Sequence, residues 1–228
     1  MATHLGPIDG ISAAGLEGRY PVDVAIEPRL TGRNRLTTFF RPVLAIPHLL
    51  LVGGPVAFAA TWFPTNESGI HLGAGVGALG AVAGVCAMIA WFAIVFGAKH
   101  PPELWRLAAL YLRWRIRAMA YVTLLRDEYP PFGDGDYPAS ITFVPPDAAR
   151  DRLTVAFRPL LAMPHFIVLW ALGMAWAVAT CVAWFSILIF GSYPEPLYRF
   201  SCGVLRWGTR VEAYMLLLRD EYPPFSFE

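Results

Sequence analysis

The sequence predicts a mainly α-helical integral membrane protein built from two similar repeats. Two apolar blocks, Pro42–Ala98 and Pro159–Pro194, contain none of the 18 basic residues. Apolar stretches of this length with few or no charges are typical of membrane-spanning helices. In addition, the nine residues Leu124–Phe132 recur unchanged as Leu217–Phe225, 217 − 124 = 93 positions later. A match of this length indicates a duplicated unit.

The duplication extends beyond these nine residues, with one change of spacing. Phe40–His48 recurs with two substitutions as Phe157–His165, at 157 − 40 = 117 positions, whereas Trp91 pairs with Trp184 at 184 − 91 = 93 positions. The first copy therefore carries 117 − 93 = 24 extra residues between those points. We divide the chain into an N-terminal cytoplasmic tail at 1–19, a first repeat at 20–132, a linker at 133–136 and a second repeat at 137–228.

Each repeat is expected to begin with a short β-strand. Val22, Val24 and Ile26 alternate with other residues in the first repeat, and Ile141 and Phe143 do so in the second. Apolar residues at every second position, bracketed by prolines, are typical of a strand. Because an isolated strand is not stable, we expect the two strands to pair in a small cytoplasmic sheet.

The first repeat is expected to cross the membrane twice, in spans at about 42–61 and about 74–97 joined by a polar turn at 62–72. The second repeat has only residues 159–190 for the same task. A single helix there would be about 48 Å long. It would also place the arginines of the second repeat on the opposite side from their counterparts, against the positive-inside tendency. We therefore predict a short transmembrane or re-entrant hairpin at about 159–190, turned near Gly173.

The basic residues also predict an orientation. Arginines precede the first span and follow the second, and the turn at 62–72 has neither Lys nor Arg. This pattern predicts a multi-pass protein of the bacterial inner (cytoplasmic) membrane with both termini in the cytoplasm. Because each repeat would enter and leave on one side, the repeats would be parallel, related by an axis along the membrane normal.

An amphipathic interfacial helix is expected to close each repeat, at about 101–126 and about 195–219. Matching arginines lie seven and four residues apart in both segments, which places them on one helical face. Such a face either holds the helix at headgroup depth or binds lipid phosphates. Together with the arginine that precedes each apolar block, the predicted lipid- or phosphate-binding residues are Arg41, Arg106, Arg113, Arg117, Arg158, Arg199, Arg206 and Arg210.

Two histidines at matching positions, His48 and His165, lie inside the predicted membrane segments. An ionisable residue there is a functional candidate, so this pair is a possible cofactor or proton site. The alternative is a neutral histidine bonded to a carbonyl that Pro47 or Pro164 leaves free. No Cys, Asp or Glu lies near either histidine in the sequence to complete a metal site. We therefore predict no metal and no cofactor, with pigment or haem as the unsupported alternative.

The repeated Arg-Asp-Glu-Tyr-Pro-Pro-Phe element is expected to end each interfacial helix, because Pro-Pro cannot continue it. Adjacent Asp and Glu side chains on a helix point about 100° apart, and an arginine stands beside them. We therefore predict a structural clasp and no catalytic residue. The predicted clasp residues are Arg126, Asp127, Glu128, Tyr129, Arg219, Asp220, Glu221 and Tyr222.

The Arg-Pro-x-Leu-Ala-x-Pro-His and Leu-Arg-Asp-Glu-Tyr-Pro-Pro-Phe elements together resemble a bacterial membrane-protein family described as a domain of unknown function, over residues 20–227. The resemblance implies transmembrane hairpins and no established activity. We expect a non-enzymatic accessory or scaffold protein that binds lipid headgroups or a larger membrane complex. A homodimer is a further option, and no nucleic acid is expected. The alternative is a small carrier or a pigment- or cofactor-binding protein that uses His48 and His165.

Overall fold

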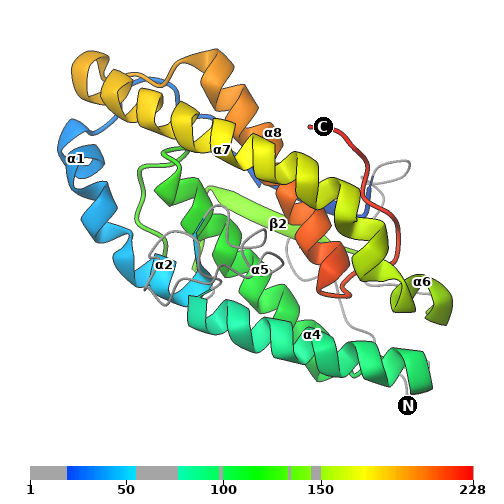
Figure 1. The fold of residues 1–228 in the computed structure, drawn as a ribbon. Helices are drawn as coiled ribbons and strands as arrows, with labels where there is room; N and C mark the ends of the chain where they lie inside the picture. The colour runs from blue at the N-terminus through cyan, green and yellow to red at the C-terminus, as the bar shows by residue number, and fades with distance from the viewer. Residues whose placement is uncertain (1–19, 55–76, 98–99, 133–134, 145–149, 228) are drawn as a thin grey trace, which may run out of the picture.

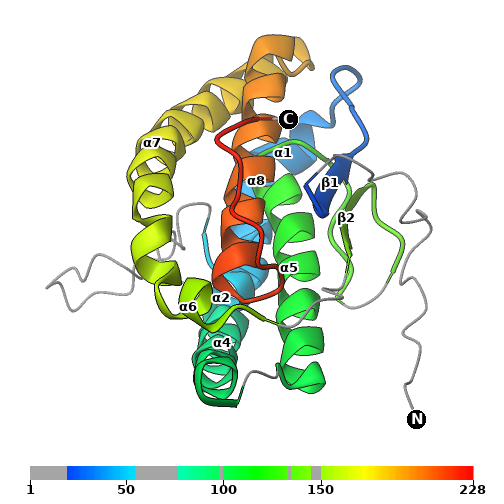
Figure 2. The same cartoon turned by 90° about the vertical axis from the view of Figure 1, so that its right-hand side faces the viewer.

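The computed structural model describes residues 20–54, 77–97, 100–132, 135–144 and 150–227. Its fold is mainly helical, with two central helices lying between long apolar helices and a small sheet (Figure 1). Figure 2 shows the sheet and α7 on opposite sides of these central helices. Within the described residues, two helices are long and apolar enough to cross a membrane, or three if one bent pair forms a single span.

The sheet pairs one strand from each repeat. β1 (Val22–Ile26) runs antiparallel to β2 (Ala139–Phe143), and its central residue Val24 lies opposite Ile141. Both of these side chains are buried against the central helices. Since 24 + 117 = 141, the central pair joins equivalent positions of the two copies. The small two-stranded sheet predicted from the alternating pattern is confirmed.

The first long run of the fold consists of α1 (Arg35–Leu44), α2 (Ile46–Val52) and α4 (Gly77–Gly97). α1 and α2 meet at a bend of 45°. α4 begins where α2 ends, because a Cβ on Gly77 would lie 2.5 Å from the backbone N of Gly53. Gly77 also has φ of +69°, which favours glycine. The end of α2 and the start of α4 are therefore in contact, although 77 − 53 = 24 positions separate Gly53 from Gly77.

These helices agree only in part with the spans expected for the first repeat. α4 falls within the predicted span at 74–97. The helical run begins at Arg35, before the predicted span at 42–61, and α2 ends at Val52, inside it. Residues 55–61 and the predicted turn at 62–72 lie outside the described residues.

The second long run consists of α6 (Arg152–Ala156) and α7 (Arg158–Phe190), a continuous helix of 33 residues. The prediction of a short hairpin at 159–190 is therefore wrong. By the two spacings, Val52 corresponds to Leu169 (52 + 117) and Gly77 to Trp170 (77 + 93), which are neighbours in α7. The physical reason is that the first copy carries an insertion into a helix, whereas the second copy has no turn to form.

Two central helices, α5 (Pro102–Val122) and α8 (Glu195–Met215), follow the long runs. Their positions match the expected interfacial helices within a few residues, but both are largely buried inside the protein. The apolar side of each packs against α4 or α7, and the other side packs against the sheet. The prediction that these helices lie at the lipid interface is wrong, since protein covers both of their faces.

Matched contacts hold the two long runs side by side. The indole Nε1 of Trp184 on α7 donates to the carbonyl of Thr38 on α1, at 2.9 Å. The Nε1 of Trp91 on α4 donates to the carbonyl of Val155 on α6, also at 2.9 Å. Each contact joins the end of one run to the start of the other, so the runs lie antiparallel.

Candidate functional site

The two repeated sequence elements of each copy contact one another in the folded chain. We call this contact the repeat clamp. In the first copy it consists of Arg33, Arg41, His48, Asp127 and Phe132, and in the second of Arg150, Arg158, His165, Asp220 and Phe225. A clamp therefore fastens the end of a central helix to the start of a long run.

A carboxylate shared by two arginines lies in each clamp. Asp127 pairs with Arg33 at 2.9 Å and with Arg41 at 2.8 Å, and all three side chains are at least nine-tenths buried. In the second copy, Asp220 pairs with Arg158 at 2.6 Å and also contacts Arg150. Buried charges need such partners, because an uncompensated charge in the interior is costly.

Backbone carbonyls satisfy much of the remaining donor capacity of these arginines. Arg41 donates to the carbonyls of Tyr121 and Arg126, and its guanidinium lies 4.4 Å from the centre of the Tyr121 ring. Arg158 makes the equivalent contacts in the second copy. The prediction that Arg41 and Arg158 bind lipid phosphate is therefore wrong, because both are buried and committed to internal partners.

Each histidine is enclosed by aromatic side chains of its own repeat. His48 stacks on Phe132 at 4.7 Å between ring centres, and its Nδ1 accepts a hydrogen bond from Trp114 at 3.4 Å. His165 stacks on Phe225 at 3.9 Å and accepts from Trp207 at 3.1 Å.

Neither histidine is exposed, and the two do not share a site. The expected bond to a freed carbonyl is replaced by the tryptophan donors. Since each Nδ1 accepts a hydrogen bond, the ring proton of the neutral form belongs on Nε2.

The predicted clasp residues do not form one group in the structure, because they have different partners. Arg126 donates to both carboxylate oxygens of Glu128 at 3.0 Å, and Arg219 binds Glu221 in the same way. The neighbouring Asp127 belongs instead to the buried clamp. The tyrosines Tyr129 and Tyr222 contact the histidines rather than the acids.

Acid is expected to weaken this clasp. Burial alone would raise the pKa of Glu128 and Glu221, but hydrogen bonds and the adjacent arginine hold the pKa of each below its ordinary value. The stability they contribute is therefore present above the unfolded pKa of about 4.3 and is lost as pH falls through the folded pKa. In thermal scans, the unfolding temperature should decrease as the pH is lowered below about 4.3. This decrease should be less steep in the Glu128→Gln plus Glu221→Gln variant. Equal slopes in both proteins would refute this.

Sequence reasoning missed Arg33 and Arg150 as members of the clamp. Both donate to the carbonyl of a leucine with positive φ, namely Leu124 (φ 65°) and Leu217 (φ 61°). A left-handed leucine is strained, so the arginine stabilises a helix end that the residue itself disfavours. The signal was available, since 33 + 117 = 150 pairs the two arginines.

The predicted arginine stripe divides into two groups. Arg106 and Arg199 are exposed and pair with Glu103 and Glu195 at 2.9 and 2.5 Å. Of the other four, Arg206 and Arg210 on α8 lie beside β1, where Arg206 is half-buried and Arg210 is buried. Arg113 and Arg117 on α5 are half-buried. Arg206 donates to the carbonyl of Val24 at 3.1 Å.

A pocket of about 690 Å³ lies where α8 meets β1. Arg206, Arg210 and Tyr20 line it together with the carboxylates of Asp23 and Glu27. Two arginines and two carboxylates give this pocket no net charge, so phosphate binding there stays a prediction.

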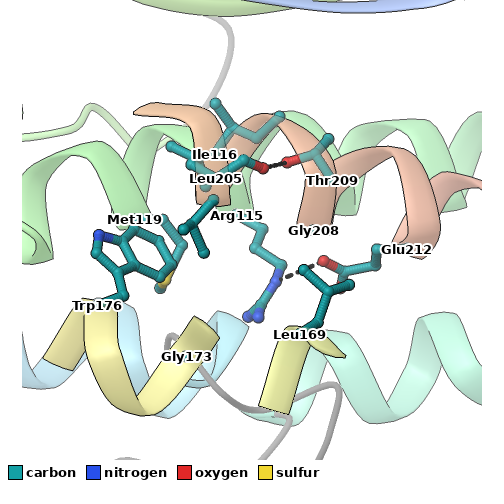
Figure 3. Close-up of a pocket in the computed structure, with 11 residues that line it drawn as sticks. Arg115, Ile116, Met119, Leu169, Gly173, Trp176, Leu205, Gly208, Thr209 and Glu212 are labelled. Atoms are coloured by element: carbon teal, nitrogen blue, oxygen red, sulfur yellow. Dashed lines mark hydrogen bonds and ion pairs between the residues drawn. The ribbon is translucent and has the colours of Figure 1, made fainter. Parts of the chain in front are cut away.

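The sequence did not predict a buried charge cluster at the centre of the fold (Figure 3). Arg115 on α5 donates from Nε to Glu212 on α8 at 2.8 Å, and the hydroxyl of Tyr111 donates to the same carboxylate at 2.8 Å. The side chains of Arg115 and Glu212 are 5% and 13% exposed. A cavity of about 20 Å³ lies beside the pair, which is room for about one water molecule.

This cluster explains how the first copy tolerates its insertion. Arg115 also donates to the carbonyls of Val52 and Gly54, at 2.5 and 3.0 Å, where α2 ends. Carbonyls at a helix end lack intrahelical partners. The position equivalent to Arg115 is Gly208 (115 + 93), and α7 is unbroken there, so no cap is needed. Comparing the copies by charge would also have revealed Glu212, whose counterpart is Met119.

The described residues contain no group of three or more His, Cys, Asp or Glu side chains that could hold a metal ion. The carboxylates of Asp127, Asp220 and Glu212 are each paired with at least one arginine. What the arrangement offers is a rigid, charge-compensated interior beneath an apolar outer surface.

Comparison with known proteins supports a duplicated domain. A family model described as a domain of unknown function (DUF4389) matches residues 72–133 and, a second time, residues 152–226. Neither a curated protein nor a solved structure matches the chain. The two matches together cover more than half of the sequence, so the chain belongs to the DUF4389 family.

Proposed function

We propose that this protein is a non-enzymatic integral protein of the bacterial inner membrane that binds a lipid acyl chain. The observation that carries the proposal is an apolar groove of about 590 Å³ between α4, the start of α7 and the end of α8. Pockets that hold small molecules typically have volumes of about 300–1,000 Å³ and mostly apolar walls. The two walls α4 and α7 are also the helices that are apolar enough to enter a membrane.

The walls of the groove suit a hydrocarbon chain. Gly84 on α4 leaves space along one wall, and Met88, Phe166 and Met215 supply apolar contacts. A Cβ on Gly84 would have no atom within 4 Å, so this part of the groove is open. Each buried methylene of a ligand is worth about 0.8 kcal/mol, which favours a long chain over a small polar molecule.

The charged groups that line the groove are paired within the protein. Arg158 at the start of α7 pairs with Asp220, and Arg115 neutralises the carboxylate of Glu212, to which the lining residue Tyr111 also donates. The groove therefore presents little net charge to an occupant, which supports a neutral chain as the ligand. The histidines lie outside the groove lining, so no observation favours the cofactor-binding alternative.

Filling the groove should displace the lipid. Gly84→Leu adds four carbon atoms into open space, which removes room for three or four methylenes of a ligand. At about 0.8 kcal/mol each, this predicts at least about tenfold weaker retention. The measurement is native mass spectrometry of protein extracted from bicelles of phosphatidylethanolamine and phosphatidylglycerol, counting bound lipid per chain.

A matched control lies on the same helix. Gly97 is exposed, its Cβ would also meet no atom within 4 Å, and it does not line the groove. Gly97→Leu should therefore leave lipid retention unchanged. Loss of lipid in both variants, or in neither, would show that the groove is not the binding site.

A further inference from the structure

The exposed apolar surface of the molecule is concentrated on the two long runs. Side chains that are more than half exposed include Leu50 on α2, Phe92 on α4 and Ile167, Val178 and Ile189 along α7. On α7 such residues extend from the first turn to the last, whereas the buried positions form a narrow seam. A helix this exposed and this apolar needs a hydrocarbon environment around most of its circumference.

The sheet lies on the opposite side of the central helices from α7 (Figure 2). Its central pair, Val24 and Ile141, joins equivalent positions of the two copies. The two tryptophan contacts are equivalent as well: each joins the end of one long run to the start of the other, antiparallel run. The rotation that relates the copies therefore passes through the middle of the sheet and across the long runs, near mid-length of α7. Figure 1 shows β2 level with the middle part of α7.

The position of the sheet near mid-length of α7 is incompatible with α7 crossing a bilayer from end to end. If α7 spanned, the sheet would lie at the depth of the membrane centre. Among the described residues the sheet has only two strands, so each strand has one side without a neighbouring strand, and the Glu27 carboxylate next to the sheet is 77% exposed. Open sheet edges and exposed charges do not occur in the hydrocarbon layer. At 33 residues, α7 is also about 50 Å long against a core of about 30 Å.

An in-plane arrangement removes these conflicts. If the long runs lie along the membrane, their apolar surface enters the acyl layer while the sheet and the arginines that face it remain in water. The copies are then related by an axis along the membrane normal.

We propose that the protein embeds in a single leaflet, with α7 parallel to the membrane plane and both of its ends on the same aqueous side. This deepens the proposed function, since it makes the partner of the apolar surface the acyl layer of one leaflet. The groove between α4 and α7 then opens towards that layer.

Cysteine accessibility tests the orientation. Cys86, Cys181 and Cys202 are free and are first replaced by alanine. Single cysteines are then placed at Arg152 and Glu195, two exposed positions that flank α7. In sealed inverted membrane vesicles, a membrane-impermeant maleimide should label both positions to the same extent, and in right-side-out vesicles it should label neither. Labelling of one position in each vesicle type would show that α7 spans and would overturn the proposal.

A third position tests immersion. Val178 lies in the middle of α7 and is 65% exposed in the protein itself. In the same cysteine-free background, Val178→Cys should resist the reagent from both sides and react after detergent is added. Reaction in intact vesicles would place α7 in water and overturn the inference. Extraction of the whole chain by sodium carbonate would instead refute the proposed membrane function itself, so the two failures are distinguishable.

Discussion

Replacing Asp127 with alanine is expected to destabilise the protein by about 3–5 kcal/mol, among the largest single-residue effects in the chain. Its carboxylate pairs with Arg33 and Arg41, whose side chains are 0% and 2% exposed. Both guanidinium groups would stay buried without their counterion. For a chain of this size, the thermal midpoint should fall by about 6–20 °C, measurable by differential scanning fluorimetry in detergent.

Two other carboxylates provide graded controls for this experiment. Asp220→Ala should cost less, because the Asp220 side chain is 26% exposed, so water can enter the space that it leaves and hydrate Arg150 and Arg158. Glu128→Ala should cost at most about 1 kcal/mol, as is usual for a partly exposed ion pair, since its side chain is 39% exposed. Similar midpoints for the three variants would contradict the buried clamp.

The repeat clamp of the first copy also shows what the sequence alone could not predict. An arginine before a proline at the start of an apolar block is typical of a membrane interface, which is why Arg41 was assigned to phosphate. Its true partner lies 86 residues later. No local pattern distinguishes an arginine that meets lipid from one that folding brings to a carboxylate.

Other parts of the fold were accessible from local patterns. Alternation with a period of two located both strands, and the helical spacing of matching arginines located α5 and α8 within a few residues. These features depend on short-range periodicity. Such periodicity does not show which faces of a helix are covered by elements elsewhere in the chain. For this reason the sequence predicted α5 and α8 at the membrane surface and not in the core.

The hairpin prediction failed for a different reason. A difference of 24 residues between two copies can mean that one copy lost a turn or that the other gained an excursion. The difference in length alone does not distinguish these two explanations. The contact of Gly77 with Gly53 and the continuity of α7 through Leu169 and Trp170 decide for an insertion in the first copy. The single unmatched arginine on α5, Arg115, was the trace of it in the sequence.

The Arg115→Met variant is expected to lose about 3–5 kcal/mol of stability. Of its partners among the described residues, Glu212 would keep only the Tyr111 hydroxyl, and the carbonyls of Val52 and Gly54 would lose their Arg115 donor. A buried carboxylate and two orphaned carbonyls are each costly to leave unpaired. The thermal midpoint in detergent should fall about as far as in Asp127→Ala.

A second substitution should recover part of this loss. In Arg115→Met plus Glu212→Met the uncompensated carboxylate is gone, and apolar side chains fill a site whose counterpart in the first copy already holds Met119. Replacing a buried ion pair by apolar residues is often nearly neutral, whereas breaking it is not. The double variant should therefore be more stable than Arg115→Met, with a coupling of about 1–3 kcal/mol in the double-mutant cycle. Recovery stays incomplete because the carbonyls at the end of α2 remain uncapped. Strictly additive losses would show that Arg115 acts only as a helix cap and that its contact with Glu212 contributes nothing to stability.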